Sequence, residues 1–204
     1  MIDLSKWPTS EKFQVILADP PWSFETFSKK GIEKSAERHY DTMTFDELCS
    51  LPVPEVTAER AALFMYTTWP VLIDHKKLFY EVVDAWGFRP SGLAWEWIKF
   101  NKATGKFAFG GGYGTRKNVE PCVLCIKKKG KSGIAKPKLK SRSVRDMIFA
   151  QRREHSRKPD EHYAIIEQMF DGPYLELFGR TPVEGWSRWG NDTERFPLLT
   201  RLPT

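Results

Sequence analysis

Cysteine is scarce in this chain, which has three among its 204 residues. An odd number argues against a disulfide framework. Cys122 and Cys125 form a C-x-x-C, but they lie in the strand-like run 119–126, where a separation of three points side chains to opposite faces. Because no second pair of ligands lies nearby in the sequence, we expect no metal site.

Long apolar runs are also missing. No segment approaches the length of a membrane span, and residues 1–7 have no apolar core of signal-peptide length. We therefore expect a cytoplasmic protein that does not enter a membrane. The content of 41% hydrophobic and 14% aromatic residues is enough for a well-filled core, and no repeat or linker divides the sequence. We expect a single domain over residues 1–204.

Acidic residues are absent from one segment, 127–145, which contains nine basic residues. The rest of the chain has 23 basic and 26 acidic residues, so this segment supplies the whole positive excess of +6. Its Lys, Gly, Ser and Pro content predicts a flexible loop. Such a loop is either a solvated surface feature or a strip that contacts backbone phosphates, in which case Lys136, Lys138 and Lys140 are the expected contacts.

Strand-like and helix-like segments alternate along the rest of the sequence, which predicts an α/β sheet layered by helices. Thr44 and Glu47 have the spacing of a capping box at the start of a helix, and Gly87 is placed to end a second helix. Expected strands cover 13–18, 61–67, 93–100, 119–126, 147–150 and 174–178, and expected helices cover 44–51, 71–86 and 159–170.

The tetrapeptide Asp19-Pro20-Pro21-Trp22 directly follows the first apolar strand. The two prolines have fixed φ and no N–H, so they make a stiff turn that holds the Pro20 carbonyl in place. The Asp19 carboxylate and this carbonyl can each accept one N–H of a purine amino group, which localises the nitrogen lone pair, and Trp22 can stack on the ring. The alternative is a Pro-rich turn beside a core tryptophan.

Three further blocks follow in a fixed order. They are Tyr113-Gly114-Thr115-Arg116 with Asn118 and Glu120, then His155-Ser156-Arg157-Lys158-Pro159-Asp160-Glu161-His162-Tyr163, and then Tyr174-Leu175-Glu176-Leu177-Phe178-Gly179-Arg180 with Gly185-Trp186 and Trp189-Gly190-Asn191-Asp192. With the tetrapeptide, these blocks span roughly residues 13 to 192.

The four blocks together resemble the DPPW-type N6-adenine methyltransferases, which include the catalytic subunit of the eukaryotic mRNA adenosine methyltransferase and bacterial and phage DNA-modifying enzymes. The resemblance implies a Rossmann-like, S-adenosylmethionine-dependent methyltransferase fold. The tetrapeptide precedes the expected cofactor strand by roughly 155 residues. That order implies the circularly permuted form of the fold, with the C-terminal strand inserted back into the sheet.

The cofactor implied by the resemblance is S-adenosylmethionine. The matching positions Arg180, Asn191 and Asp192 are expected to contact it, with Glu176 and Phe178 as weaker candidates. Asn191 and Asp192 suit hydroxyl recognition because both accept hydrogen bonds. The sequence has no G-x-G-x-x-G, so the usual glycine-rich cofactor loop is absent.

Candidate substrate contacts come from other segments. The resemblance places Tyr40 on a loop over the active site, and it matches Arg116 and Glu120, of which Glu120 is expected to orient a loop or meet the cofactor ammonium. Gly110–Gly114 lacks the following Lys-Ser/Thr of a P-loop, so we expect a flexible substrate-gating loop. Lys158, four residues before His162, is interpreted as structural.

The expected reaction is methyl transfer to the 6-amino group of adenine in DNA, with short or relaxed sequence specificity and a possible homodimer. DNA is favoured over RNA because the chain is small and has no additional RNA-binding module. RNA adenosine methylation is the first alternative. A non-catalytic nucleic-acid-binding scaffold of the same fold is the second, although Asp19 and Trp22 are both intact.

Overall fold

A computed structural model describes residues 4–22, 42–110, 114–154 and 157–200. Its strands form one sheet in the order β6-β3-β4-β2-β1-β7-β8, with β5 paired to β4. The strands are β1 (Phe13–Ala18), β2 (Thr57–Tyr66), β3 (Phe88–Phe100), β4 (Val119–Lys129), β5 (Gly133–Ile134), β6 (Met147–Gln151), β7 (Tyr174–Leu177) and β8 (Trp186–Trp189).

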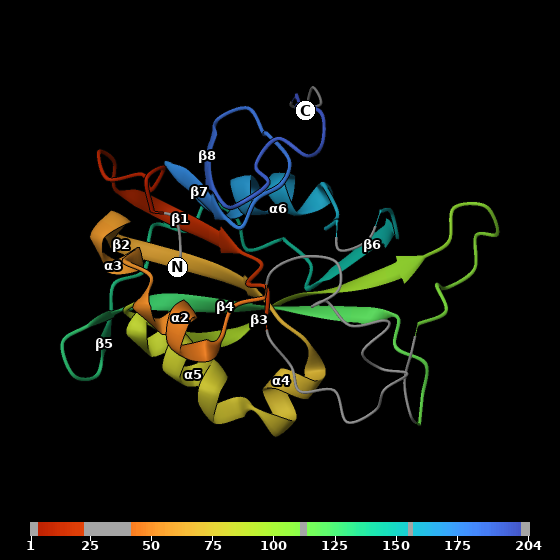
Figure 1. Cartoon of the computed structure of the whole chain (residues 1–204), viewed down its shortest axis with the longest axis horizontal. Coiled ribbons are helices and arrows are strands. Elements are labelled where there is room, and N and C mark those ends of the chain that lie inside the picture. The colour runs from red at the N-terminus through yellow and green to blue at the C-terminus, as the bar shows by residue number, and fades with distance from the viewer. Residues whose placement is uncertain (1–3, 23–41, 111–113, 155–156, 201–204) are drawn as a thin grey trace.

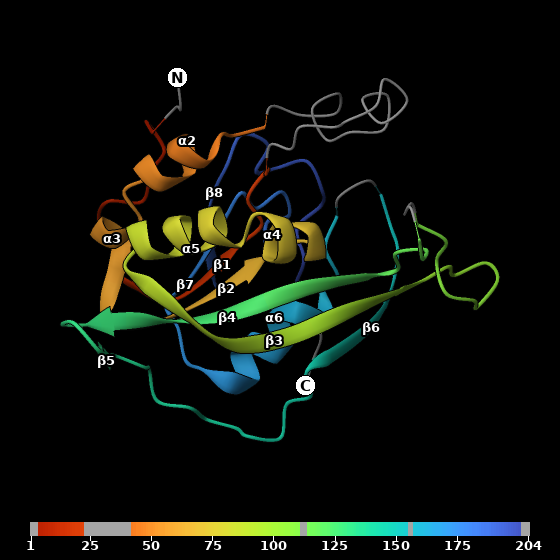
Figure 2. The same cartoon turned by 90° about the horizontal axis from the view of Figure 1, so that it is seen from below.

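Helices cover both faces of the sheet. Figure 2 shows the first four described helices above the sheet, and α6 and the segment that joins β5 to β6 below it. The helices are α2 (Phe45–Ser50), α3 (Val53–Val56), α4 (Trp69–Asp74), α5 (Lys76–Ala85) and α6 (Glu161–Met169). None of these described helices has the length and apolar character needed to span a membrane.

The first strand is buried on both faces, as its continuous apolar sequence predicts. Ile16 and Ala18 pack into the cluster under α2 and α5, whereas Val15 and Leu17 pack into the cluster against α6. Strand β1 pairs in parallel with β2 on one side and with β7 on the other. Since β1 is sandwiched in this way, Asp19, which follows it, is fixed at the carboxyl edge of the parallel strands.

The topology confirms the Rossmann-like α/β fold and its permuted order. Strand β7, far from β1 in sequence, lies beside it, and β8 pairs in parallel with β7 at the sheet edge. The ends of β1, β2, β7 and β8 therefore meet at one edge, which is where open α/β sheets bind ligands. The start of α6 lies at this edge too, because α6 runs back antiparallel to β7 (Figure 1).

Several local predictions need correction. The helix expected over 71–86 is two helices that meet at His75, and the strand Trp186–Trp189 is not among the expected strands. The segment 127–145 does not begin as a flexible loop, because residues up to Lys129 belong to β4. The Lys127 ammonium is half-buried and donates hydrogen bonds to the carbonyls of Thr57 and Ala58.

Other local predictions are confirmed. Thr44 and Glu47 form a capping box at α2, and Gly87 has a positive φ of 83° just after α5. Cys122 and Cys125 lie in the two different core clusters, on opposite faces of β4. All three cysteines are free thiols.

Candidate active site

A lysine connects the Asp-Pro-Pro-Trp turn to the rest of this edge. The Lys158 ammonium lies 2.7 Å from Oδ2 of Asp19 and 2.9 Å from Oε1 of Glu120. Lys99, near the end of β3, binds the other oxygen of Glu120 at 2.5 Å. Two carboxylates and two ammonium groups therefore alternate in a row, and Lys158 also lies 5.2 Å from the centre of the Tyr66 ring.

The pKa values follow from this alternation. Burial alone would raise the pKa of Glu120, but Lys158 and Lys99 outweigh burial and lower it to about 2. Burial alone would lower the pKa of Lys158, but Asp19 and Glu120 raise it above its usual value. Burial raises the pKa of the Asp19 carboxyl, and the charge of Lys158 opposes that rise. The Lys158 ammonium is thus the group that favours an ionised Asp19.

The Asp-Pro-Pro-Trp turn has a compact backbone. The Pro20 carbonyl accepts a hydrogen bond from the Trp22 amide at 2.8 Å, and the Pro21 carbonyl accepts one from Met43 at 3.0 Å. A carbonyl oxygen has two lone pairs, so Pro20 keeps the capacity to accept a second donor. The turn therefore leaves the Pro20 carbonyl able to accept an N–H of a purine amino group, as the sequence predicts.

The expected role of Trp22 as a stacking plate is corrected. Its side chain is 5% exposed and packs against the rings of Phe45 and Phe79, with centroid separations of 5.6 and 6.1 Å. Its indole N–H donates to the Tyr66 carbonyl at 3.3 Å. The ring thus anchors the Asp-Pro-Pro-Trp turn to the core instead of presenting a free face to a base.

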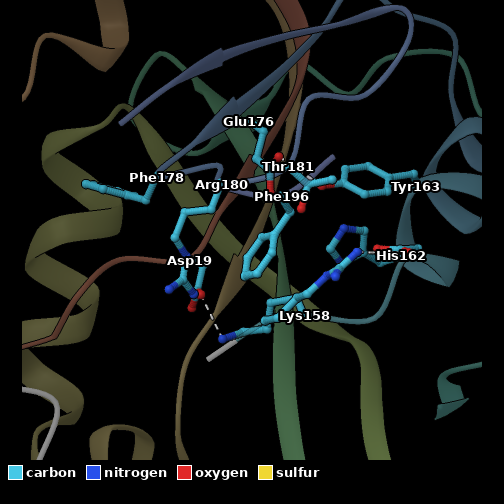
Figure 3. A pocket seen from close by; sticks show the side chains of 11 residues that line it. Asp19, Lys158, His162, Tyr163, Glu176, Phe178, Arg180, Thr181 and Phe196 are labelled. Carbon is cyan, nitrogen blue, oxygen red and sulfur yellow. Dashed lines mark hydrogen bonds and ion pairs between the residues drawn. The ribbon is translucent and has the colours of Figure 1, made fainter. Parts of the chain in front are cut away.

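A small pocket that is open to solvent lies beside Asp19. Figure 3 shows the Arg180 guanidinium and the Phe196 ring facing the Asp19–Lys158 pair. The pocket is formed by the loop before α6, the end of β7 and the segment near Phe196. Its lining includes Asp19, Arg157, Lys158, His162, Tyr163, Glu176, Phe178, Arg180, Thr181 and Phe196.

Glu176 forms the inner wall of this pocket. Its Oε2 accepts a hydrogen bond from the Tyr163 hydroxyl at 2.9 Å. Burial raises the pKa of Glu176 to about 8. A Cβ at Gly179 would lie 2.6 Å from Oε2 of Glu176, so any other residue there would require the carboxyl group to move.

A chain of hydrogen bonds favours one tautomer of His162. The Trp95 indole, which can only donate, binds the Tyr66 hydroxyl at 3.1 Å. The Tyr66 hydroxyl keeps its own proton, and Nδ1 of His162, 3.1 Å away, is placed to accept it. Burial lowers the pKa of His162 well below its usual value, which favours a neutral ring, and an Nδ1 that accepts leaves the ring proton on Nε2. This N–H is buried and has no partner among the described residues.

The remaining predicted cofactor residues differ in position. Phe178 lines the pocket with a φ of 64°, a conformation that few non-glycine residues adopt. The backbone of Gly190 lies close to this residue, since a Cβ at Gly190 would be 3.0 Å from the Phe178 Cα. Asn191 and Asp192 follow at the same edge, but they are exposed and do not line the pocket. Asp192 is paired with Arg195 at 3.2 Å.

Several predicted substrate residues lie away from the pocket. Each Glu120 oxygen is paired with a lysine, and Glu120 is not among the residues that line the pocket, so its contact with a cofactor ammonium stays a prediction. Arg116 is exposed on the segment between β3 and β4. Tyr40 and residues 111–113 of the expected gating loop lie outside the described residues.

The three lysines of the predicted phosphate strip are not brought to the site. Lys140 pairs with Asp171 at 2.8 Å, just before β7 begins. Lys136 lies beside Arg60, in the first half of β2. This is the amino edge of the parallel strands, roughly 15–20 Å from Asp19 along a six-residue strand. Lys136, Lys138 and Lys140 therefore cannot contact phosphates next to a base held at Asp19.

Sequence reasoning misses or undervalues two residues of the site. Lys158 is interpreted from sequence as structural, yet it touches Asp19 directly. His162 stands out in the sequence only for its spacing from Lys158, yet it presents a buried donor to the pocket. The signal that could have found Lys158 is its place at the start of the α6 segment, because a helix that returns over the sheet begins at the ligand-binding edge.

Comparison with known proteins matches the MT-A70 family over residues 13–192. The chain is 33% identical over 199 residues to the type II methyltransferase M.MunI of Mycoplasma sp, covering 88% of this chain and 77% of that protein. It is 30% identical over 192 residues to the N(6)-adenosine-methyltransferase MT-A70-like of Arabidopsis thaliana, covering 92% of this chain and 24% of that protein. It is 29% identical over 194 residues to the N(6)-adenosine-methyltransferase catalytic subunit METTL3 of Homo sapiens, covering 92% of this chain and 29% of that protein.

The chain therefore belongs to the MT-A70 family of methyltransferases. It spans about a quarter of the length of these two eukaryotic relatives. Enzymes of the family use S-adenosylmethionine as the methyl donor. The pocket beside Asp19 suits such a zwitterion, since it offers cationic groups at Lys158 and Arg180, a carboxyl group at Glu176 and a buried donor at His162.

Removing the Lys158 ammonium should destabilise the fold. Lys158→Met leaves Asp19 as a buried carboxylate without its partner, and we expect a loss of about 3–5 kcal/mol in the free energy of unfolding. Adding Asp19→Asn should recover part of this loss, because it removes the unpaired charge. Urea denaturation of the single and double variants measures both effects.

The matched control is Lys140→Met, which breaks an exposed ion pair with Asp171 and should cost about 1 kcal/mol or less. Equal losses in the free energy of unfolding for Lys158→Met and Lys140→Met would contradict the claim that the Lys158 ammonium stabilises this edge of the sheet.

Glu176 should make stability depend on pH. Its folded pKa of about 8 lies above the ordinary value of 4.5, so the folded protein binds a proton that the unfolded chain has released between these values. The stabilisation of the folded state by this proton is therefore complete below pH 4.5. As the pH rises from 4.5 to about 8 it is lost, and the free energy of unfolding falls by about 1.4 kcal/mol per pH unit. Glu176→Gln stays neutral, so its stability relative to wild type should improve from pH 5.5 to pH 8.

Denaturation at several pH values measures the difference between the two proteins. The exposed Glu81→Gln variant serves as the control. If the wild-type and Glu176→Gln profiles run parallel across this range, Glu176 is not protonated in the folded protein.

Proposed function

We propose that this protein transfers a methyl group from S-adenosylmethionine to the 6-amino group of adenine in DNA. One observation carries the proposal: a carboxylate, Asp19, follows a buried strand at the carboxyl edge of the sheet and is held there by the Lys158 ammonium at 2.7 Å. The stiff turn of Pro20 and Pro21 fixes a carbonyl beside it, and a pocket opens next to both.

The amino group of adenine is a weak nucleophile because its lone pair is delocalised into the ring. Lys158 occupies Oδ2 of Asp19, so Oδ1 is the oxygen that would accept one N–H of this amine. The Pro20 carbonyl, which already accepts from Trp22, would accept the other. Two acceptors on one nitrogen draw it toward tetrahedral geometry and localise the lone pair for attack.

When bound, S-adenosylmethionine supplies an electrophilic methyl group. Arg180, Glu176 and Phe178 would hold it, since all three line the pocket. The neutral His162 would donate its Nε2–H to an oxygen of the ligand. Asn191 and Asp192, at the same edge, would contact its ribose hydroxyls.

DNA is the preferred substrate in this proposal because the alignment covers 77% of the type II methyltransferase M.MunI, a type of enzyme that modifies DNA. RNA is the second candidate, since enzymes named for N(6)-adenosine methylation match 92% of the chain. A catalytically inactive scaffold is less well supported, because Asp19 and its lysine partner are in place. We further propose short or relaxed sequence specificity, while homodimerisation stays a prediction.

Asp19→Ala should abolish methylation while leaving the fold intact. A single hydrogen bond to the reacting group in a preorganised site contributes on the order of a hundredfold or more to the rate. Single-turnover transfer of radiolabelled methyl groups to DNA measures this. Asp171→Ala, which removes a carboxylate at the opposite edge, is the matched control and should keep wild-type activity. Activity of Asp19→Ala within threefold of wild type would rule out the proposed role.

Arg180→Ala should weaken cofactor binding measured by calorimetry. A hydrogen bond to a charged group is worth about 1.5–3 kcal/mol, so we expect a loss of about tenfold or more. Combined Asn191→Ala and Asp192→Ala should weaken binding less, because both residues are exposed. Arg60→Ala, in β2 near its amino end, is the control. Unchanged affinity in Arg180→Ala would place the cofactor elsewhere, and no binding by wild type would favour the scaffold.

A further inference from the structure

Strands β3, β4 and β6 extend past the other strands at one end of the sheet (Figure 1). Three exposed phenylalanines lie on β6 and on the segment that follows β3. Phe107 is 62% exposed, Phe109 is 79% exposed and Phe149 is 56% exposed. Exposed phenylalanines are costly, and three of them in one region call for an explanation. We call this region, with Lys106, Arg116 and Lys117, the aromatic–basic surface.

The local backbone determines where these rings lie. Strand β6 alternates, so Ile148 and Ala150 face the core while Phe149 faces outward. After β3, the chain folds back at Asn101–Lys106 and pairs Phe107 with Phe100. This brings the Phe107 and Phe149 rings to a centroid separation of 6.2 Å. The two rings, tilted by 49° to each other, therefore form one apolar patch built from two elements.

A third ring is held beside a cation. The Arg116 guanidinium lies 5.5 Å from the centre of the Phe109 ring. A Cβ at Gly110 would lie 1.8 Å from the Lys117 carbonyl oxygen, so glycine is required there to let the two segments approach. Phe109 and Arg116 are thus neighbours because of this backbone contact.

The segment that carries Phe107 and Phe109 has charge of one sign. Between Lys99 and Asn118 the sequence has five basic residues and no acidic one. Four of them are exposed, namely Lys102, Lys106, Arg116 and Lys117. A second copy of this chain would bring the same positive charge to a symmetric contact, which opposes self-association through this surface. An anionic partner with flat apolar groups fits it best.

The surface is continuous with the catalytic edge. The Lys99 carbonyl accepts a hydrogen bond from the amide of Ala108, the residue between Phe107 and Phe109. The Lys99 ammonium binds Glu120, which binds Lys158, which binds Asp19. A polymer lying on the aromatic–basic surface is therefore at the same edge of the sheet as the catalytic carboxylate.

We propose that the aromatic–basic surface binds unpaired nucleotides, with Phe107, Phe109 and Phe149 stacking on bases and Lys106, Arg116 and Lys117 contacting phosphates. Ring stacking requires a base with an open face, which single strands offer and an intact duplex does not. The surface therefore favours single-stranded polynucleotide over duplex. That these nucleotides flank the target adenine rests on the proposed function, whereas the binding itself does not.

The test is a fluorescence anisotropy titration of one labelled oligonucleotide, as a single strand and as a duplex. The triple variant Phe107→Ala, Phe109→Ala, Phe149→Ala should bind the single strand at least about tenfold more weakly, with the slope of log affinity against log salt nearly unchanged. Duplex affinity should change less than about threefold, because stacking does not contribute there. The triple Phe→Leu variant, which keeps apolar bulk, should show a similar loss and guards against a folding defect.

Two further variants separate stacking from charge and from general surface effects. Combined Arg116→Gln and Lys117→Gln should make the salt slope for the single strand shallower by about 0.7 for each phosphate that the protein no longer neutralises. Tyr80→Ala removes an aromatic side chain that is 46% exposed on α5 and should have no effect.

Unchanged single-strand affinity in the triple alanine variant, or equal losses on single strand and duplex, would overturn the proposal. A wild-type dimer that becomes monomeric in this variant, measured by sedimentation, would also overturn it and identify an interface between copies. Failure of methyl transfer with intact single-strand binding would contradict the proposed function and leave this surface assignment standing.

Discussion

The ammonium of Lys158 is the group on which the geometry of this edge depends. It lies between two carboxylates, Asp19 at 2.7 Å and Glu120 at 2.9 Å, which would repel each other without it. These groups come from β1, β4 and the start of α6, so one cation connects three elements that lie far apart in the sequence. The charge of Lys158 favours the ionised form of Asp19 and holds this carboxylate at a fixed point, which a hydrogen-bond acceptor for a weakly nucleophilic amine requires.

The sheet makes this contact possible. Strands β1 and β7 lie side by side in parallel, so Asp19 and the Phe178-Gly179-Arg180 turn emerge together. Two glycines allow close approach there: Gly179 admits the Glu176 carboxyl group, and Gly190 admits the Phe178 backbone. The catalytic turn is anchored from behind by Trp22, which is part of the core. The Asp-Pro-Pro-Trp turn thus has one end in the hydrophobic core, at Trp22, and the other in the polar site, at Asp19.

Sequence patterns predict the parts of this structure that local chemistry determines. The buried β1, the capping box at Thr44, the glycine that ends α5 and the opposite faces of Cys122 and Cys125 all follow from periodicity or from conformational preference. Contacts between distant segments do not follow, because charge and aromatic character do not reveal what a side chain touches. From sequence, Lys158 is structural, Trp22 stacks on the base, and Lys136, Lys138 and Lys140 contact backbone phosphates. The structure places Lys158 on Asp19, Trp22 in the core and the three lysines at the edge opposite Asp19.

The most direct measurement is the 6-methyladenine content of nucleic acid from cells that express the protein in a host without its own adenine methylation. DNA and RNA are purified separately, digested to nucleosides and quantified by mass spectrometry, for cells with wild-type protein and for cells with an empty vector. We expect 6-methyladenine in the DNA of cells with wild-type protein and none in the DNA of cells with the empty vector. Methylation confined to RNA would contradict the proposed substrate, and no methylation in either polymer from cells with folded protein would contradict the proposed reaction.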